Sequence, residues 1–97
     1  MKRLVISSAA KDDLSDIWLY TARQWSVDQA ERYVDQLLTA CEDLAAGIKI
    51  GMTVDDLRPG HFRSFSQSHT IFYKHEAADD LVIVRILHQS MNPDDNF

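Results

Sequence analysis

Residues 26–47 read SVDQAERYVDQLLTACEDLAAG and carry the clearest helical pattern in the chain. Ser26 followed by Gln29 matches a capping box, in which both side chains satisfy backbone N–H groups at a helix start. Apolar side chains then keep to one face for about four turns, at Ala30, Tyr33, Val34, Leu37, Leu38, Cys41, Leu44 and Ala45. Gly47 supplies a stop signal. The stretch therefore predicts a long amphipathic helix, whose apolar face the rest of the chain must cover.

The preceding segment predicts a short strand and a first helix. Leu4–Ile6 is apolar and includes the β-branched Val5 and Ile6, and Ser7-Ser8 follows as a helix cap. A helix over Ala9–Trp25 places one apolar stripe at Ala10, Leu14, Ile17, Trp18, Thr21 and Trp25. Asp12 and Asp13 are expected in its first turn, where the helix dipole favours acids. Because the connection to the next helix is very short, the two helices should form an antiparallel hairpin.

Beyond Gly47 the pattern changes to loops and strands. Residues 48–60 contain an Arg58-Pro59-Gly60 turn and are expected to form a surface connection. Three strands are predicted at His61–Ser66, His69–His75 and Leu81–His88, with turns at 67–68 and 77–80 and a polar tail at 92–97. The last strand is almost entirely apolar, which favours a central place in the sheet. The N-terminal strand must pair in the same sheet, and a place beside one of these three strands is the economical choice. We predict one α+β domain over residues 1–97, ordered β-α-α-β-β-β, with the hairpin packed on a small, mainly antiparallel sheet.

The overall charge restricts the function. Ten Lys and Arg against fifteen Asp and Glu give a formal net charge of −5. Proteins that bind phosphate backbones usually carry a basic excess, so this balance disfavours general nucleic-acid binding unless a local basic patch overrides it. The single cysteine and the lack of a signal peptide or transmembrane stretch predict a cytoplasmic protein.

Most residues with reactive side chains have a structural explanation. His61, His69, His75 and His88 match no zinc-ligand spacing, so we expect no metal and no cofactor. Cys41 lies on the apolar helix stripe and should be a packed, inert thiol. The acidic pairs at 12–13, 55–56 and 79–80 fall at cap, loop and turn positions, where aspartate is favoured for backbone reasons.

The remaining candidates are cationic side chains on the predicted strands: Arg63, Lys74, Arg85 and His88. Arg85 matters most, because a charge within an apolar strand is rarely buried without a partner. One possibility is a salt bridge from Arg85 to an acid on a helix. The other is a small basic pocket of Arg63, Arg85 and His88 on the uncovered sheet face, able to bind a phosphate or a partner carboxylate.

These residues fall within a pattern that resembles the RelE/ParE family of toxins, and the ParE branch in particular. The matching segments run in order along nearly the whole chain: Asp12-Asp13-Leu14 with Ile17-Trp18, Tyr20-Thr21 and Trp25; Gln29–Tyr33; Leu57–Gly60; Phe62–Phe65; Ser68-His69 with Ile71–Tyr73; and Val84–Gln89 with Met91. The resemblance implies the toxin of a type II toxin–antitoxin pair, forming a hetero-oligomer with a ParD-like antitoxin. It implies DNA gyrase as the target, with DNA bound only through the antitoxin.

The RNA-cleaving branch of the family is the alternative. Its members cut messenger RNA on the ribosome with several Lys and Arg side chains and often a C-terminal tyrosine. This chain has no tyrosine beyond Tyr73 and carries Asp55-Asp56 where lysines would be expected. If it is a nuclease, Arg63, Arg85 and His88 are the catalytic candidates. A third possibility is a degenerate toxin that acts only as a co-regulator of its operon.

For a binding toxin, which would not be an enzyme, the sequence suggests two surfaces. The expected target surface consists of Arg63, Tyr73, Arg85, His88 and Met91, which contact the target or hold the geometry of that surface. Antitoxin is expected on apolar residues left exposed, with Tyr20, Trp25, Ile48, Ile50 and Met52 as the candidates.

Overall fold

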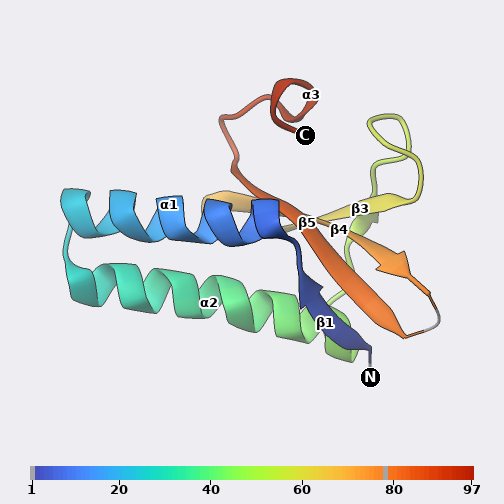
Figure 1. Cartoon of the computed structure of the whole chain (residues 1–97), viewed down its shortest axis with the longest axis horizontal. Helices are drawn as coiled ribbons and strands as arrows, with labels where there is room; N and C mark the ends of the chain where they lie inside the picture. The colour runs from blue at the N-terminus through green and yellow to red at the C-terminus, as the bar shows by residue number, and fades with distance from the viewer. Residues whose placement is uncertain (1, 78) are drawn as a thin grey trace.

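Two long helices lie side by side across one face of a five-stranded sheet (Figure 1). The computed structural model describes residues 2–77 and 79–97. The elements are β1 (Arg3–Ile6), α1 (Ser8–Gln24), α2 (Val27–Ala46), β2 (Met52–Thr53), β3 (His61–Ser66), β4 (His69–Glu76), β5 (Asp80–His88) and α3 (Pro93–Asn96). The predicted fold class is confirmed. Among these helices, none is long and apolar enough to cross a membrane.

The predicted capping residues start and end the helices. The Ser7 hydroxyl accepts a hydrogen bond from the Ala10 N–H at 3.1 Å, and the Ser26 hydroxyl accepts one from the Gln29 N–H at 3.0 Å. Gly47 ends α2 with a φ of 79°, a left-handed conformation that glycine adopts without steric cost. Because α1 begins at Ser8, its first turn contains no acid. The expectation that Asp12 and Asp13 lie in that turn was wrong.

The strand order is β1-β5-β4-β3-β2. β5 is flanked by β4 on one side and by β1, which runs parallel to it, on the other. The internal position of the last strand and the pairing of the N-terminal strand beside one of the last three strands are therefore confirmed, and the structure identifies that partner as β5. Of the turn predicted at 77–80, residue 78 lies outside the described residues, and Asp80 already belongs to β5.

The core is divided between the two faces of the sheet. Between the sheet and the helices, Leu37 and Cys41 of α2 pack with Ile71 and Ile83 of the strands, and all four are fully buried. The open face, meaning the face that α1 and α2 leave uncovered, carries a smaller cluster of Val54, Phe72, Leu87, Leu57 and Phe97.

Two elements were not predicted. Residues 48–60 are not only a connection, because Met52–Thr53 pairs with β3 and adds a fifth strand. The polar tail is not only a tail either. Asn92 caps the short helix α3, and the Phe97 ring packs against Phe72 with ring centroids 4.9 Å apart. β2 extends the sheet at its edge beside β3, whereas Phe97 of the tail packs on the open face, where it covers apolar side chains that the helical hairpin cannot reach.

Candidate functional site

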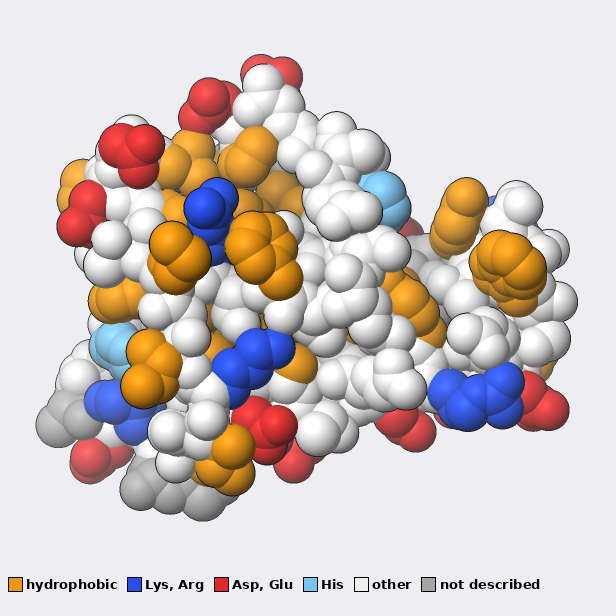
Figure 2. Space-filling model, turned by 180° about the vertical axis from the view of Figure 1, so that it is seen from behind, with side chains coloured by type: hydrophobic (Ala, Val, Ile, Leu, Met, Phe, Trp, Pro, Cys, Tyr) orange, Lys and Arg blue, Asp and Glu red, His pale blue; other side chains and the backbone are white. Residues whose placement is uncertain are grey.

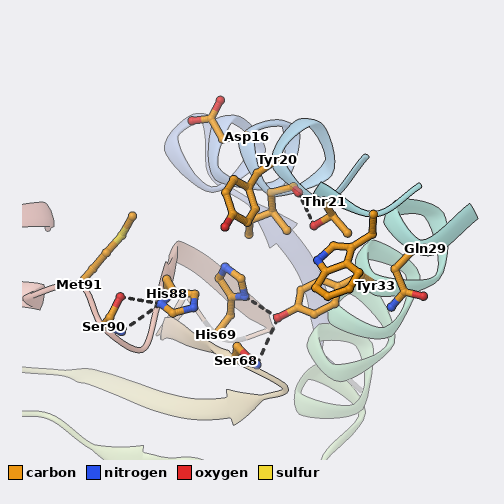
Figure 3. A pocket seen from close by; sticks show the side chains of 12 residues that line it. Asp16, Tyr20, Thr21, Gln29, Tyr33, Ser68, His69, His88, Ser90 and Met91 are labelled. Atoms are coloured by element: carbon orange, nitrogen blue, oxygen red, sulfur yellow. Dashed lines mark hydrogen bonds between the residues drawn. The ribbon is translucent and has the colours of Figure 1, made fainter. Parts of the chain in front are cut away.

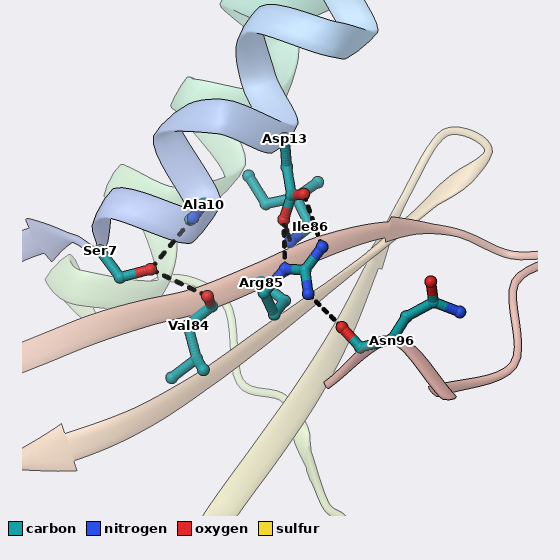
Figure 4. A network of polar contacts seen from close by, with 7 residues as sticks. All are labelled: Ser7, Ala10, Asp13, Val84, Arg85, Ile86 and Asn96. Atoms are coloured by element: carbon teal, nitrogen blue, oxygen red, sulfur yellow. Dashed lines mark hydrogen bonds and ion pairs between the residues drawn. The ribbon is translucent and has the colours of Figure 1, made fainter. Parts of the chain in front are cut away.

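Arg85 forms an ion pair with Asp13 of α1 (Figure 4). The guanidinium donates from Nε and Nη2 to the two carboxylate oxygens, both at 2.8 Å, and also donates to the Asn96 carbonyl of α3. This geometry raises the pKa of Arg85 above its ordinary value, mainly through the hydrogen bond to Asp13. The prediction of a salt bridge to a helix acid is confirmed, and Arg85 joins α1, β5 and α3.

The same carboxylate also completes the sheet. β1 ends where Ile6 pairs with Ile83, so the outer edge of β5 is uncovered beyond that point. There the Ser7 hydroxyl donates to the Val84 carbonyl at 2.8 Å, and Asp13 accepts from the Ile86 N–H at 2.9 Å. Side chains from the start of α1 thus replace the missing strand. Explaining Asp13 by backbone preference alone was wrong, because it satisfies both a cation and a backbone donor.

The predicted basic pocket of Arg63, Arg85 and His88 does not form. Arg63 and Arg85 flank Phe72 in register on the open face, but His88 follows Ile86 on the side that faces the helices. A strand alternates its side chains between the two faces, which separates residue 85 from residue 88. The structure therefore brings together neither a phosphate site nor the set of catalytic candidates from these three residues.

Tyr73 is a core residue. It is 3% exposed, stacks on Phe62 at 5.4 Å between centroids, and its hydroxyl accepts a hydrogen bond from the Gly51 N–H at 2.9 Å. Burial raises the pKa of its hydroxyl above the ordinary value. Of the two roles expected for Tyr73, the geometry fits holding a surface in place and does not fit direct contact with a target.

A groove of about 640 Å³ opens between the helical hairpin and the ends of β4 and β5 (Figure 3). Its floor includes the buried side chains of Ile17 and Thr21, and its mouth carries the exposed side chains of Tyr20, Trp25 and Met91. The remaining lining residues are Asp16, Gln29, Tyr33, Ser68, His69, His88 and Ser90. No Lys or Arg side chain lines this groove, so it suits an apolar segment better than a phosphate.

The polar groups in the groove form a fixed network. Tyr33 Oη accepts from the Ser68 N–H at 3.2 Å, so its own proton is free to bond His69 Nδ1, 2.7 Å away. His88 Nδ1 accepts from the Ser90 N–H at 3.1 Å. Both imidazoles are thereby directed to carry their proton on Nε2 when neutral. The two rings are perpendicular, with centroids 5.2 Å apart, because His69 and His88 are direct cross-strand neighbours.

His69 should make the fold sensitive to mild acid. Its pKa is lowered from 6.5 to about 4, first by burial and then by the neighbouring His88, with Asp13 acting in the opposite direction. A lowered folded-state pKa contributes stability that is fully present above pH 6.5 and is lost as the pH falls toward 4. We therefore expect the free energy of unfolding, measured with urea, to fall less between pH 7 and pH 4.5 in His69→Gln than in the parent chain.

The matched control is His75→Gln, because His75 is exposed and outside this network. It should retain the acid dependence of the parent. If the free energy of unfolding fell equally between pH 7 and pH 4.5 in the parent and in His69→Gln, His69 would not be the source of the acid sensitivity.

The expected antitoxin residues fall into two separate groups. Tyr20 and Trp25 lie at the mouth of the groove and are 65% and 76% exposed. Ile48, Ile50 and Met52 are also exposed, but they follow the far end of α2 and lead into β2. Since α2 has 20 residues, the two groups lie about 30 Å apart along its axis. One compact segment cannot cover both.

Tyr33, His69 and Ser90 were not among the predicted site residues, although they form the polar wall of the groove. For His69, part of the information was present in the sequence. His69 begins the second predicted strand of the meander and His88 ends the third, so their strands were expected to pair, but only the register shows that the two residues are neighbours. Met91 and His88, predicted for the target surface, also line this groove.

Cys41 is fully buried, and burial raises the pKa of its thiol to about 12. At neutral pH it is therefore a protonated, unreactive packing residue, as predicted. Within residues 2–77 and 79–97 there is no group of three or more His, Cys, Asp and Glu side chains arranged to hold a metal ion.

A solved structure of the chromosomal ParDE toxin–antitoxin system from P. aeruginosa shares this fold with a TM-score of 0.77, at 17% identity, over 91% of this chain and 96% of that one. The family model for the ParE toxin of the type II toxin–antitoxin system parDE matches residues 4–93.

Curated relatives agree with that match. Toxin ParE1 of Mycobacterium tuberculosis is 40% identical over 94 residues, covering 97% of this chain and 96% of that protein. Toxin ParE1 of Caulobacter vibrioides is 40% identical over 92 residues, covering 95% of this chain and 94% of the relative. Toxin ParE of Escherichia coli is 29% identical over 92 residues, or 95% of this chain and 89% of that protein. The chain belongs to the ParE toxin family of type II toxin–antitoxin systems.

Proposed function

We propose that this toxin acts in the cytoplasm by binding and inhibiting DNA gyrase, and that a ParD-like antitoxin neutralises it. Family membership supports a toxin with an antitoxin partner. The choice of target binding over RNA cleavage rests on one observation, the dispersal of Arg63, Arg85 and His88. RNA cleavage needs an acid, a base and a cation around one phosphate. Here Arg85 is occupied by Asp13, and His88 lies on the opposite face from Arg63.

The antitoxin occupies the groove in this proposal. Exposed Tyr20, Trp25 and Met91 provide aromatic and apolar contacts, and the imidazole N–H groups of His69 and His88 can meet a carbonyl or carboxylate of the bound segment. The target surface lies instead on the open face around Arg63. The two partners would therefore approach from different sides of the sheet.

Two parallel assays test this function. Purified toxin should inhibit gyrase supercoiling and should leave messenger RNA intact on the ribosome. Ribosome-dependent cleavage with unaffected supercoiling would instead support the nuclease alternative. If the toxin affected neither but bound operator DNA together with antitoxin, the co-regulator role would stand. Growth arrest by the isolated chain would exclude that role.

Trp25→Ala should weaken binding of the ParD-like antitoxin about thirtyfold, because large aromatic side chains at a groove mouth contribute about 2 kcal/mol to binding. Gyrase inhibition by the variant should stay within about twofold of the parent, since Trp25 lies far from the open face. Affinity is measured by calorimetry. The matched control is Leu19→Ala, which removes an exposed side chain of α1 that does not line the groove. Equal affinities for the two variants would contradict antitoxin binding in the groove.

A further inference from the structure

A second exposed surface combines cations with aromatic and apolar side chains. We call it the open-face patch and define it by Met52, Arg58, Arg63, Phe65 and Phe97. Met52 is 61% exposed and Phe65 is 54% exposed. Figure 2 views the molecule from behind and shows Lys and Arg side chains lying among hydrophobic ones, with most acids at the outline. In a chain of net charge −5, a cationic area of this kind is unexpected.

The patch is built by packing along one row of the sheet. Arg63 lies opposite Met52 on one side and Phe72 on the other. Phe97 packs on Phe72, and the Arg58 guanidinium lies over the Phe97 ring at 4.5 Å. The Arg63 guanidinium lies 5.2 Å from the Phe65 ring centroid. Two planar cations are thus held against aromatic rings on the same face.

These cations lack acidic partners in the described part of the chain. Its ion pairs join Arg3 to Asp80, Lys74 to Glu76 and Arg85 to Asp13, and none involves Arg58 or Arg63. Arg63 Nε is shielded from solvent and forms no hydrogen bond to any described residue. A shielded donor without an acceptor is unfavourable in the free protein, and a shift of the Arg63 side chain that brought Nε to a ligand oxygen would relieve that cost.

The nearest acids by sequence do not neutralise Arg63. Asp55 accepts a hydrogen bond from the Gly60 N–H at 3.0 Å, which fixes it within the loop before β3. Asp94 and Asp95 lie on α3, three and two residues before Phe97, whose ring the Arg58 guanidinium covers. The whole chain carries a formal net charge of −5, so a long polyanion such as nucleic acid would be repelled by the surface beyond the patch, whereas a short acidic segment contacts the patch alone.

We propose that the open-face patch is a docking site for a short, extended protein segment in which acidic and apolar side chains alternate. Its carboxylates meet Arg63 and Arg58, and its apolar side chains pack on Met52 and Phe65. The edge of the sheet favours an extended chain, because β2 has only two residues and pairs with Phe62 and Arg63. Val54 adds one backbone hydrogen bond to the His61 carbonyl, so among the described strands none pairs with residues 64–66 on that edge. Lys49 donates to the Phe65 carbonyl at 2.8 Å and marks the limit of that open edge.

This inference deepens the proposed target surface and rests on it only for the statement that the segment belongs to the target. The direct test needs no gyrase. A short end-blocked peptide of alternating glutamate and leucine is titrated into isotopically labelled toxin and followed by amide NMR. Signals of Met52, Arg63 and Phe65 should move, signals of Tyr20 and Trp25 should not, and added salt should weaken the effect.

Arg63→Gln should weaken binding of this peptide about fivefold. The affinity of Arg63→Lys should lie between those of the parent and Arg63→Gln, since lysine keeps the charge but loses the planar guanidinium. The matched control is Arg23→Gln, which removes an arginine from the last turn of α1 and should change nothing. Melting temperatures of all three variants exclude unfolding as the cause.

Several results would overturn the proposal: no binding to the patch, equal binding of a glutamine-for-glutamate peptide, or signal changes confined to the groove. Tighter binding of single-stranded oligothymidine to the patch would identify it as a nucleic-acid surface instead. The supercoiling assay separates the two proposals. If the peptide binds but gyrase is not inhibited, the docking site stands and the proposal that gyrase is the target fails. If gyrase is inhibited but the peptide does not bind, the gyrase proposal stands and the docking site fails.

Discussion

Asp13→Ala is expected to lower the free energy of unfolding by about 3 kcal/mol, because removing one partner of a largely buried ion pair leaves the other charge uncompensated. The Asp13 side chain is 11% exposed and that of Arg85 is 25% exposed, so solvent can replace the carboxylate only in part. The Ile86 N–H loses its acceptor in the same variant. Urea unfolding followed by circular dichroism measures the change.

Two further variants separate the ion pair from a general effect of removing an acid. Asp12→Ala deletes the neighbouring, exposed carboxylate of the same helix and should change stability by less than about 0.5 kcal/mol. The double variant Asp13→Leu with Arg85→Met should be more stable than Asp13→Ala, because apolar replacement removes both charges together. A loss in Asp13→Ala no larger than in Asp12→Ala would show that the pair contributes little.

This ion pair also determines what Arg85 can do in the toxin. Its guanidinium is bound on one side by Asp13 and on the other by the Asn96 carbonyl, so it holds α3 and the Phe97 ring against the sheet. Variants of Arg85 would consequently disturb the open-face patch as well as the fold. Loss of toxicity on mutating Arg85 therefore does not identify a catalytic residue, whereas loss at Arg63 without loss of stability points to contact with the target.

Local patterns predicted the larger elements correctly, for reasons that are visible in the structure. Ser7, Ser26 and Gly47 act through backbone groups within three or four residues, so their effect is encoded in short windows of sequence. The apolar spacing in α2 identified Leu37 and Cys41 as core residues because one buried face imposes helical periodicity.

The functional surfaces depend on contacts that short windows do not encode. Arg85 and His88 are three residues apart and were placed in one pocket, but strand alternation puts them on opposite faces. The partner of Arg85 is 72 positions away in the sequence. Trp25 could be assigned either to the apolar stripe of α1 or to an exposed surface, and only the end of the helix at Gln24 decides this.

β2 was missed because a single close approach creates it. Gly51 has no side chain, and this lets its backbone lie against the Arg63 carbonyl and the Tyr73 ring, where its N–H donates to the Tyr73 hydroxyl at 2.9 Å. A Cβ atom at this position would lie 2.9 Å from Tyr73 Cε1 and closer still to the tyrosine hydroxyl and the Arg63 carbonyl. Nothing in the local sequence distinguishes this glycine from an ordinary loop glycine.

Gly51→Ala should therefore cost about 2–3 kcal/mol of stability through overpacking, and should detach β2 from β3. Amide signals of Met52 and Thr53 should lose their strand character, and because Met52 lies opposite Arg63, binding at the open-face patch should weaken as well.

Gly60→Ala is the matched control. It has a φ of 76° but open space around the Cβ position, so it should cost about 1 kcal/mol of backbone strain and leave β2 paired. Adding Tyr73→Phe to Gly51→Ala should restore only part of the lost stability, since the Arg63 carbonyl still obstructs the new methyl group. A Gly51→Ala chain as stable as the parent, with β2 still paired to β3, would contradict this account. It would mean that the backbone at residue 51 can move away from Tyr73 and the Arg63 carbonyl at little cost.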